Sequence, residues 1–263
     1  MAGTRSRSSG GRTPLREPPL RKLGWIPDTP DHRDRYAAHA PEDLPPAVDL
    51  RPLLPPVYDQ GDLGSCTAQA IAAAVQYTQK KQGFPVWMPS RLFIYYNERV
   101  MESSVSEDSG AMIRDGIKSL NRDGVCYESL WPYEPSRFAE KPSPACYEVA
   151  KNHPSVRYAR IHQYARFIKG ALAQGDVIVF GATLYESFES ASVSRTGRVP
   201  YPEATEVPMG GHCMLACGYE GDDVLVRNSW GAAWGEDGYC WMPMDYLCST
   251  NLADDFWSLA QVA

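Results

Sequence analysis

The sequence predicts an α+β protein whose two lobes meet at a cleft. Apolar residues recur at helical spacing in the first half of the chain, whereas the second half contains runs of β-forming residues and a hairpin pattern. Helices and strands that are segregated in this way favour an α+β architecture over an alternating α/β one. The 263 residues suffice for one large domain or two small ones.

Three helices are predicted in the first half, each with an apolar stripe, at residues 67–81, 91–101 and 111–124. Gly83 and Gly124 suit the ends of the first and third helices, because glycine readily adopts the left-handed conformation found there. Ser90 is a typical N-cap for the second helix.

In the second half, a short helix at residues 165–175 precedes a predicted strand at residues 176–184. The runs GHCMLACGY and DVLVRNSW flank the turn-forming sequence EGDD at residues 220–223. This pattern predicts a β-hairpin.

The amino-terminal segment has a different composition. Residues 1–43 are rich in Arg, Ser, Gly, Pro and Asp without periodicity, and about the first 20 are predicted to be disordered. Trp25 and Ile26 lie among prolines in LGWIPDTPDHRD, which predicts an extended segment that packs on the rest of the protein. We therefore expect a leader at residues 1–43 and a domain at 44–263, with a helical lobe at roughly 62–150 and a β lobe at roughly 151–263.

Composition excludes several classes of partner. The net charge of −6 argues against nucleic acid, because binding phosphates needs a basic surface. The chain has no run of about 18 apolar residues and no apolar core of a secretory signal peptide. No membrane association is expected, and the compartment stays open between the cytoplasm and export by a non-classical route.

The cysteines predict neither a zinc site nor a disulfide framework, because their number is odd, their spacing is irregular and no C-x-x-C pair occurs. We expect no metal and no organic cofactor. The seven cysteines are Cys66, Cys126, Cys146, Cys213, Cys217, Cys240 and Cys248.

Cys66 and His212 are the candidate reactive pair. Cys66 lies between turn residues and the start of the first predicted helix, where unpaired N–H groups and the helix dipole stabilise a thiolate. Of the five histidines, His212 alone opens an apolar strand, directly after a Gly-Gly turn. A nucleophilic cysteine needs such a partner to hold it as a thiolate.

Three further residues complete a possible site. Hairpin pairing is expected to bring Asn228 beside His212, where its carboxamide accepts a hydrogen bond from the imidazole. Trp230 then covers this bond and excludes water. Gln60, six residues before Cys66, offers a side-chain amide as a donor to a developing oxyanion, with the Cys66 backbone N–H as the second donor.

The motifs QGDLGSC, GGHCMLACGY and RNSWGAAWGEDGY together resemble the papain family of cysteine peptidases. The separation of 146 residues between Cys66 and His212 lies within the range of about 130–150 that is typical of this family. LPPAVDLR resembles the start of its mature domain, and SLWPYE resembles the segment that closes its helical lobe. LGWIPDTPDHRD and DSGAMIRDGI are most similar to a bacterial branch with a short leader.

This resemblance implies a papain-like fold, a helical lobe facing a β-barrel-like lobe, and roles for named residues. Cys66 is implied as the nucleophile, His212 as the general acid and base, and Asn228 as the residue that orients the imidazole. Gln60 is implied as an oxyanion donor, and Trp230 as the cover of the Asn–His pair.

Two substrate contacts are also implied. Gly110 occupies the position whose backbone pairs with substrate beside the scissile bond. Asp254 aligns with the floor of the S2 pocket, where a carboxylate predicts acceptance of Arg or Lys.

The chain departs from the family pattern at three places. Leu63 replaces a cysteine that normally forms a disulfide, and Thr67 replaces the usual aromatic residue after the nucleophile. The leader is too short for the helical inhibitory prodomain of papain. We expect instead that Trp25 and Ile26 dock on the enzyme while the leader crosses the cleft and holds a zymogen.

The expected function is endopeptidase hydrolysis by a monomer that acts on protein or peptide substrates and that protein inhibitors can block. One alternative keeps the site but passes the acyl group to an amine, as in an acyltransferase or ligase. Another is a catalytically silent binding protein on the same fold, against which the intact set of Gln60, Cys66, His212 and Asn228 argues. Exopeptidase activity would need an extra loop across the cleft, and the sequence shows no histidine-bearing insertion of that kind.

Overall fold

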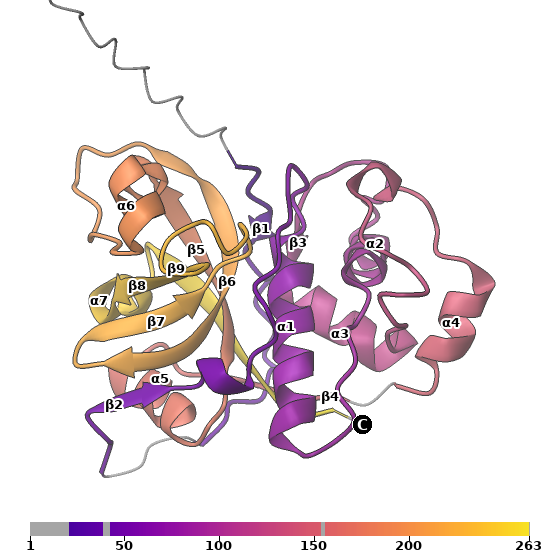
Figure 1. Cartoon of the computed structure of the whole chain (residues 1–263), viewed down its shortest axis with the longest axis horizontal. Coiled ribbons are helices and arrows are strands. Elements are labelled where there is room, and N and C mark those ends of the chain that lie inside the picture. The colour runs from indigo at the N-terminus through magenta and orange to yellow at the C-terminus, as the bar shows by residue number, and fades with distance from the viewer. Residues whose placement is uncertain (1–20, 39–42, 154–155, 263) are drawn as a thin grey trace, which may run out of the picture.

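The computed structural model describes residues 21–38, 43–153 and 156–262. In Figure 1 a lobe built on a sheet lies to the left of a lobe of helices, and helix α1 runs between them. This arrangement is the α+β architecture expected from the segregation of helical and β patterns. The predicted disorder of the first 20 residues lies outside the described residues.

The helices of the right-hand lobe lie close to their predicted positions. α1 is buried from Cys66 to Gln79 because it packs against α2 and α3 on one side and against the sheet on the other. The side chain of Ser90 accepts the Phe93 N–H at 3.1 Å and caps α2. Gly124, with φ of +70°, ends α3. The helices of this lobe are α1 (Cys66–Lys81), α2 (Arg91–Met101), α3 (Ile113–Asp123) and α4 (Pro144–Ala150), with the 3₁₀ helix η2 (Pro135–Arg137).

The other lobe is one antiparallel sheet in the order β4-β9-β5-β6-β7-β8, with β2 also paired to β6. Its strands are β2 (Ala47–Asp49), β4 (Val156–Arg160), β5 (Ile178–Tyr185), β6 (Pro208–Glu220), β7 (Asp223–Arg227), β8 (Tyr239–Pro243) and β9 (Ala253–Val262). The helices near it are α5 (Ala165–Ala173), α6 (Ala191–Thr196) and α7 (Met244–Cys248), with the 3₁₀ helices η1 (Arg51–Leu53) and η3 (Glu186–Glu189).

The β6–β7 hairpin matches the predicted one and fixes the register beside the cleft. Leu215 pairs with Arg227, so Asn228 follows directly at the end of β7. The first part of β6, up to Met214, extends beyond the hairpin and pairs with β5 alone. In this part His212 lies opposite Ala182. The end of β6 nearest the helices is therefore held by β5.

The leader reaches both lobes. Strand β1 (Trp25–Ile26) pairs in parallel with strand β3 (Ala111–Met112), which directly precedes α3. Further along, Tyr36 forms a bridge with Arg160 of β4. The described part of the leader thus crosses from the helical lobe to the sheet (Figure 1).

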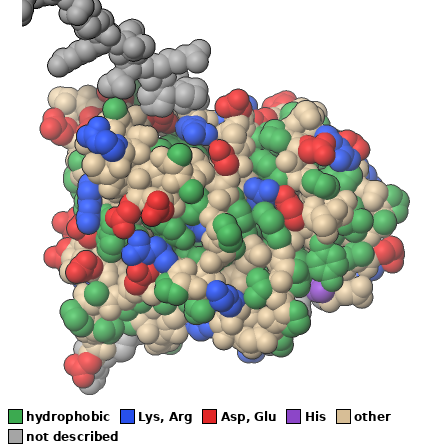
Figure 2. All heavy atoms as spheres, in the orientation of Figure 1, with side chains coloured by type: hydrophobic (Ala, Val, Ile, Leu, Met, Phe, Trp, Pro, Cys, Tyr) green, Lys and Arg blue, Asp and Glu red, His purple; other side chains and the backbone are tan. Residues whose placement is uncertain are grey.

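The visible face of the molecule carries charges of both signs. Figure 2 shows acidic and basic side chains interspersed over one face of both lobes, without one large basic area. Among the described residues, no helix is long and apolar enough to cross a membrane.

Candidate active site

Cys66 begins α1 and lies against β6. Its sulfur accepts the backbone N–H of Cys213 at 3.3 Å, and Cys213 directly follows His212. Strand β6 therefore brings His212 to the start of the helix that carries the cysteine. Cys66 and His212 are both fully buried.

The imidazole of His212 is held from one side. Its Nε2 and the Oδ1 of Asn228 lie 2.8 Å apart, and the same oxygen accepts the Ser229 N–H at 2.8 Å. Because a carboxamide oxygen only accepts, Nε2 carries the proton. Nδ1 is buried without a hydrogen-bond partner among the described residues, and it is the nitrogen left for proton transfer. The Trp230 ring packs on the imidazole with the centroids 5.0 Å apart.

Gln60 is fully buried and fixed at both ends of its side-chain amide. Its Oε1 accepts the Ser229 hydroxyl at 2.6 Å, which links it to the residue after Asn228. Its Nε2 donates to the carbonyl of Leu63 at 2.9 Å and to the carbonyl of Lys22, in the leader, at 3.0 Å. The carbonyl oxygen of Lys22 therefore accepts from Gln60 Nε2, the donor that is expected to bind an oxyanion.

Gly110 lies where the leader backbone approaches most closely. Its φ is +78°, and a Cβ built on it would lie 2.1 Å from the carbonyl oxygen of Gly24. The same Gly24 oxygen accepts the Ala111 N–H at 2.8 Å. Only glycine permits another backbone segment, here the leader, to approach this closely at position 110.

The indole of Trp25 fills a pocket beside His212. A Cβ added at Gly181 would lie 1.9 Å from the indole, and one added at Gly211 would lie 2.3 Å from the Trp25 carbonyl oxygen and 2.9 Å from its ring, so two glycines of the sheet make room for Trp25. Trp25 Nε1 donates to Asp255 Oδ2 at 3.2 Å. The pocket thus has an apolar wall and one buried acceptor.

The structure separates Asp254 from this pocket. The Asp254 side chain is 59% exposed, whereas that of Asp255 is 1% exposed and contacts Trp25. Asp254 therefore does not face the Trp25 pocket, and Asp255 is the acidic residue that does. The physical reason is the backbone: Asp255 has φ of +59°, and the pairing of β9 with β5 is irregular near this point. Such an irregularity changes which side chain faces inward.

Burial sets the charge state of the candidate pair. It raises the pKa of the Cys66 thiol to about 12 and lowers the pKa of His212 from 6.5 to about 4, because both charged forms lose their contact with water. At neutral pH the two groups are therefore a thiol and a neutral imidazole in this conformation. This state differs from the charged pair that a nucleophilic cysteine needs.

A buried carboxyl behind the nucleophile was not predicted from the sequence. Glu98 of α2 is fully buried, and its Oε1 accepts the Thr67 hydroxyl at 2.6 Å. Burial raises the pKa of Glu98 well above its ordinary value, because the charged form loses its contact with water. Thr67, which stands where the family has an aromatic residue, is the only signal that could have pointed to this contact.

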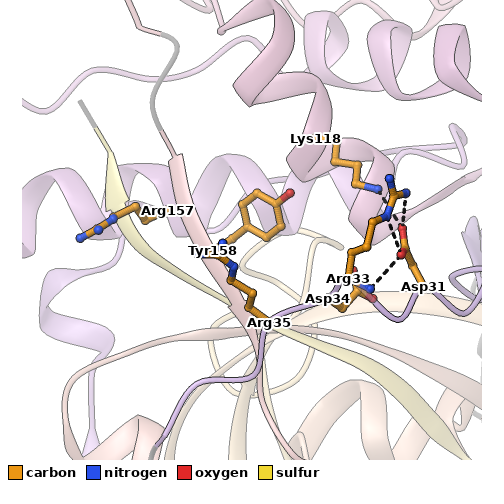
Figure 3. A pocket seen from close by; sticks show the side chains of 7 residues that line it. All are labelled: Asp31, Arg33, Asp34, Arg35, Lys118, Arg157 and Tyr158. Atoms are coloured by element: carbon orange, nitrogen blue, oxygen red, sulfur yellow. Dashed lines mark hydrogen bonds and ion pairs between the residues drawn. The ribbon is translucent and has the colours of Figure 1, made fainter.

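A hollow of about 480 Å³ lies elsewhere, between the leader and the two lobes. It contains none of the candidate catalytic residues. Figure 3 shows that polar and charged side chains line it, and that Asp31 binds Arg33 and faces Lys118. Its lining residues are Asp31, Arg33, Asp34, Arg35, Lys118, Arg157 and Tyr158. Among the described residues, no cluster of three or more metal-ligating side chains occurs.

Comparison with known proteins decides the family. The sequence profile described as papain family cysteine protease matches residues 44–256. The chain belongs to the papain family of cysteine proteases. This papain-family enzyme is 43% identical to xylellain, a cysteine protease from Xylella fastidiosa, whose crystal structure superposes with a TM-score of 0.86 over 93% of this chain and 98% of that one.

Two further relatives support the same assignment. An uncharacterized peptidase C1-like protein of Acanthamoeba polyphaga mimivirus is 43% identical over 92% of this chain and 88% of its own length. Papain from Carica papaya is 24% identical over 75% of this chain and 54% of its own length. As a cysteine protease of this family the protein is a hydrolase, and protein or peptide substrates are implied.

The buried imidazole predicts how stability depends on pH. The folded-state pKa of His212 lies below its ordinary value, so its contribution to folding is complete above about pH 6.5 and is lost as the pH falls toward 4. The shift corresponds to about 3 kcal/mol of unfolding free energy. The free energy of unfolding is measured by urea titration at pH 7 and at pH 4. Between these two pH values, wild type is expected to lose roughly this amount more than His212→Gln does. Equal losses in the two proteins would contradict the burial of a neutral imidazole.

Proposed function

We propose that the protein is an endopeptidase that cleaves peptide bonds through Cys66 and His212 and that its leader holds it inactive. The observation that carries the proposal is the convergence of four side chains at one point. Cys66 lies at the start of α1, His212 and Asn228 lie on the adjoining strands, and Gln60 is joined to them through Ser229.

Acylation begins when the leader has left and His212 Nδ1 takes the proton of the Cys66 thiol. The thiolate attacks the carbonyl carbon of the substrate, and the tetrahedral oxyanion receives hydrogen bonds from Gln60 Nε2 and the Cys66 backbone N–H. His212 then protonates the leaving nitrogen. The C–N bond breaks, the amine product departs, and a thioester to Cys66 stays behind.

Deacylation reverses these roles. His212 takes a proton from water, which attacks the thioester carbonyl and forms a second oxyanion at the same donors. The C–S bond breaks, the acid product leaves, and the thiol is restored. Throughout both steps Asn228 holds the imidazole in the tautomer that leaves Nδ1 without a hydrogen and able to accept a proton.

The leader contacts argue for inhibition at the same point. Lys22 offers a carbonyl to the oxyanion donor, Gly24 lies against Cys66 and Gly110, and Trp25 fills the neighbouring pocket. The leader therefore displaces substrate and also removes the water that a charged Cys66–His212 pair requires. Occlusion and loss of charge both act against catalysis.

Labelling with a thiol-reactive epoxide tests the nucleophile. After the leader is released, we expect modification at Cys66 by peptide mapping, and complete loss of labelling and peptide turnover in Cys66→Ala. Cys248→Ser is the matched control, because Cys248 is the one partly exposed thiol among the described cysteines. Turnover that survives in Cys66→Ala would overturn the proposal.

Release of the leader tests the inhibition. A specific protease site placed within residues 39–42 permits the folded full chain to be cut, and kcat/KM on a small fluorogenic peptide is expected to rise at least about 10-fold, since the open state becomes the populated one. Trp25→Ala is expected to raise the rate of the uncut chain, whereas His32→Ala, an exposed leader residue, should leave it unchanged. Equal rates before and after the cut, with release verified by mass spectrometry, would contradict inhibition by the leader.

A further inference from the structure

The leader places a carboxylate in a site that the rest of the chain provides. Asp28 is fully buried at its side chain, and its Oδ1 accepts the backbone N–H of Arg114 at 3.0 Å, in the first turn of α3. Its Oδ2 accepts Trp257 Nε1 at 2.8 Å. Both donors lie after residue 43, so they stay when the leader departs. The two N–H groups and the positive end of α3 form a receptor for one anionic oxygen pair.

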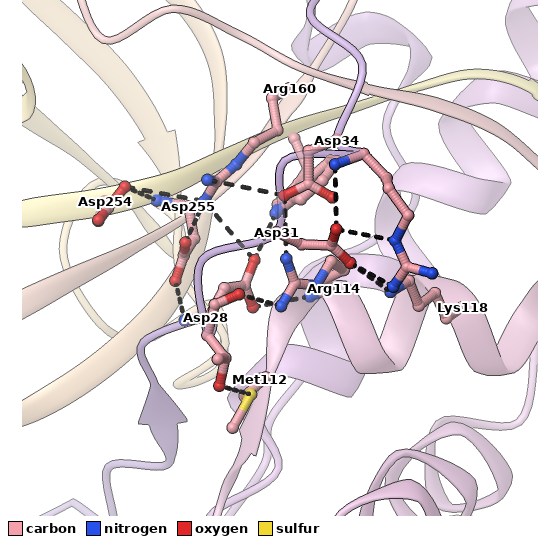
Figure 4. Close-up of polar contacts among 12 residues, drawn as sticks. Asp28, Asp31, Asp34, Met112, Arg114, Lys118, Arg160, Asp254 and Asp255 are labelled. Atoms are coloured by element: carbon pink, nitrogen blue, oxygen red, sulfur yellow. Dashed lines mark hydrogen bonds and ion pairs between the residues drawn. The ribbon is translucent and has the colours of Figure 1, made fainter.

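Two arginines surround this receptor (Figure 4). Arg160 of β4 approaches Asp28 Oδ2 at 3.7 Å, and Arg114 pairs with Asp34 of the leader at 2.9 Å. Arg114 also donates to the carbonyl of Thr29, and its side chain is only 6% exposed. The polar partners shown for Arg114 thus all belong to the leader. Departure of the leader therefore removes the acidic partner of Arg114, whereas Arg160 keeps Asp255.

The receptor adjoins the groove next to Cys66. Asp255 Oδ2 accepts both the indole N–H of Trp25 at 3.2 Å and the backbone N–H of Asp28 at 2.7 Å. Trp25 in turn pairs with Ala111, beside Gly110. From the nucleophile outward, the groove therefore contains Gly24, then the Trp25 pocket, then the seat of Asp28.

The carboxylate of Asp255 lies next to the seat of Asp28 and repels a second carboxylate bound there. Burial and the charge of Asp28 raise the pKa of Asp255, and burial raises the pKa of Asp28. Arg160 contacts both carboxyls, with Asp255 as its nearest partner, and so offsets their repulsion. The structure accommodates an acid in this seat next to Asp255, because Asp28 already occupies it.

We infer that the active enzyme uses the seat of Asp28 to bind an acidic side chain of its substrate, beyond the pocket that Trp25 fills. The ligand class is an Asp or Glu residue of a peptide, held by the α3 N-terminus, the Trp257 indole and Arg160. This inference rests on the proposed function, because it names a substrate feature for the same cleft.

Internally quenched peptides provide the test. The peptides are made in pairs that carry Asp or Asn at one position, and the pairs cover the four residues on either side of the scissile bond. The enzyme is the full chain after it has been cut within residues 39–42. At one position we expect kcat/KM to be about 10-fold higher for Asp than for Asn, because hydrogen bonds to a charged carboxylate are stronger than those to a neutral amide. This ratio should fall below about 3-fold in Arg160→Gln and in Trp257→Phe.

Lys118→Gln is the matched control. Lys118 lies on the same helix as Arg114 and contacts Asp31 at 3.8 Å, so the variant removes a positive charge without touching the seat of Asp28. Its Asp-to-Asn ratio should equal that of wild type. Because each ratio is measured within one protein, partial unfolding of a variant cancels.

The outcomes separate the two proposals. Cleavage of all peptides with no preference for Asp at any position would overturn the acidic subsite and leave the endopeptidase proposal standing. The acidic subsite would also be overturned if Lys118→Gln reduced the preference for Asp as much as Arg160→Gln does. Long-range electrostatic attraction would then explain the preference. If a sample of the released enzyme still reacts with the epoxide at Cys66 but the unlabelled enzyme cleaves none of the peptides, the endopeptidase function is contradicted, and the subsite with it.

Discussion

The proposed inhibition depends on one interaction, the contact of the leader backbone with Cys66 and its neighbours. Cys66 and His212 are fully buried, Gly24 of the leader lies against the thiol, and burial disfavours the charged form of each group. The pKa of Cys66 is raised and that of His212 is lowered, which is the reverse of what nucleophilic attack needs. Under the proposed inhibition, the same residues form an inert neutral pair when the leader fills the groove and a reactive charged pair after it has left.

Helix α1 and strand β6 make this possible. α1 is buried along most of its length between the two lobes, so its first residue is fixed relative to both. β6 is paired with β5 and β7, and the hydrogen bond from Cys213 to the Cys66 sulfur ties the strand to the helix. None of these contacts involves the leader, so they would hold the site together in the proposed enzyme from which the leader has left.

Much of this arrangement could be predicted from the sequence, because the strongest signals are local. The α1 pattern, the Ser90 cap and the β6–β7 hairpin all rest on neighbouring residues. The contact of Asn228 with His212 follows from the hairpin, and the packing of Trp25 follows from its apolar character among prolines. The structure brings together Cys66, His212, Asn228, Trp230 and Gln60 as the motifs indicated.

Other features depend on pairing that no local pattern reveals. Strands β4 and β9 are far apart in sequence and contain charged residues, so neither was predicted. The positive φ of Asp255 turns that side chain inward and leaves Asp254 exposed, a one-residue difference that alternation alone cannot resolve. The contacts of Asp28 and Glu98 were likewise hidden, because each joins segments that meet only in the folded chain.

The pH dependence of Cys66 alkylation, measured before and after release of the leader, tests most directly whether the leader governs the charge of the pair. We expect slow alkylation of the intact chain, rising only at alkaline pH as the thiol of raised pKa ionises. After release, fast alkylation should extend into the acidic range, as expected for a thiolate held by an imidazolium. Identical profiles with and without the leader would contradict this account.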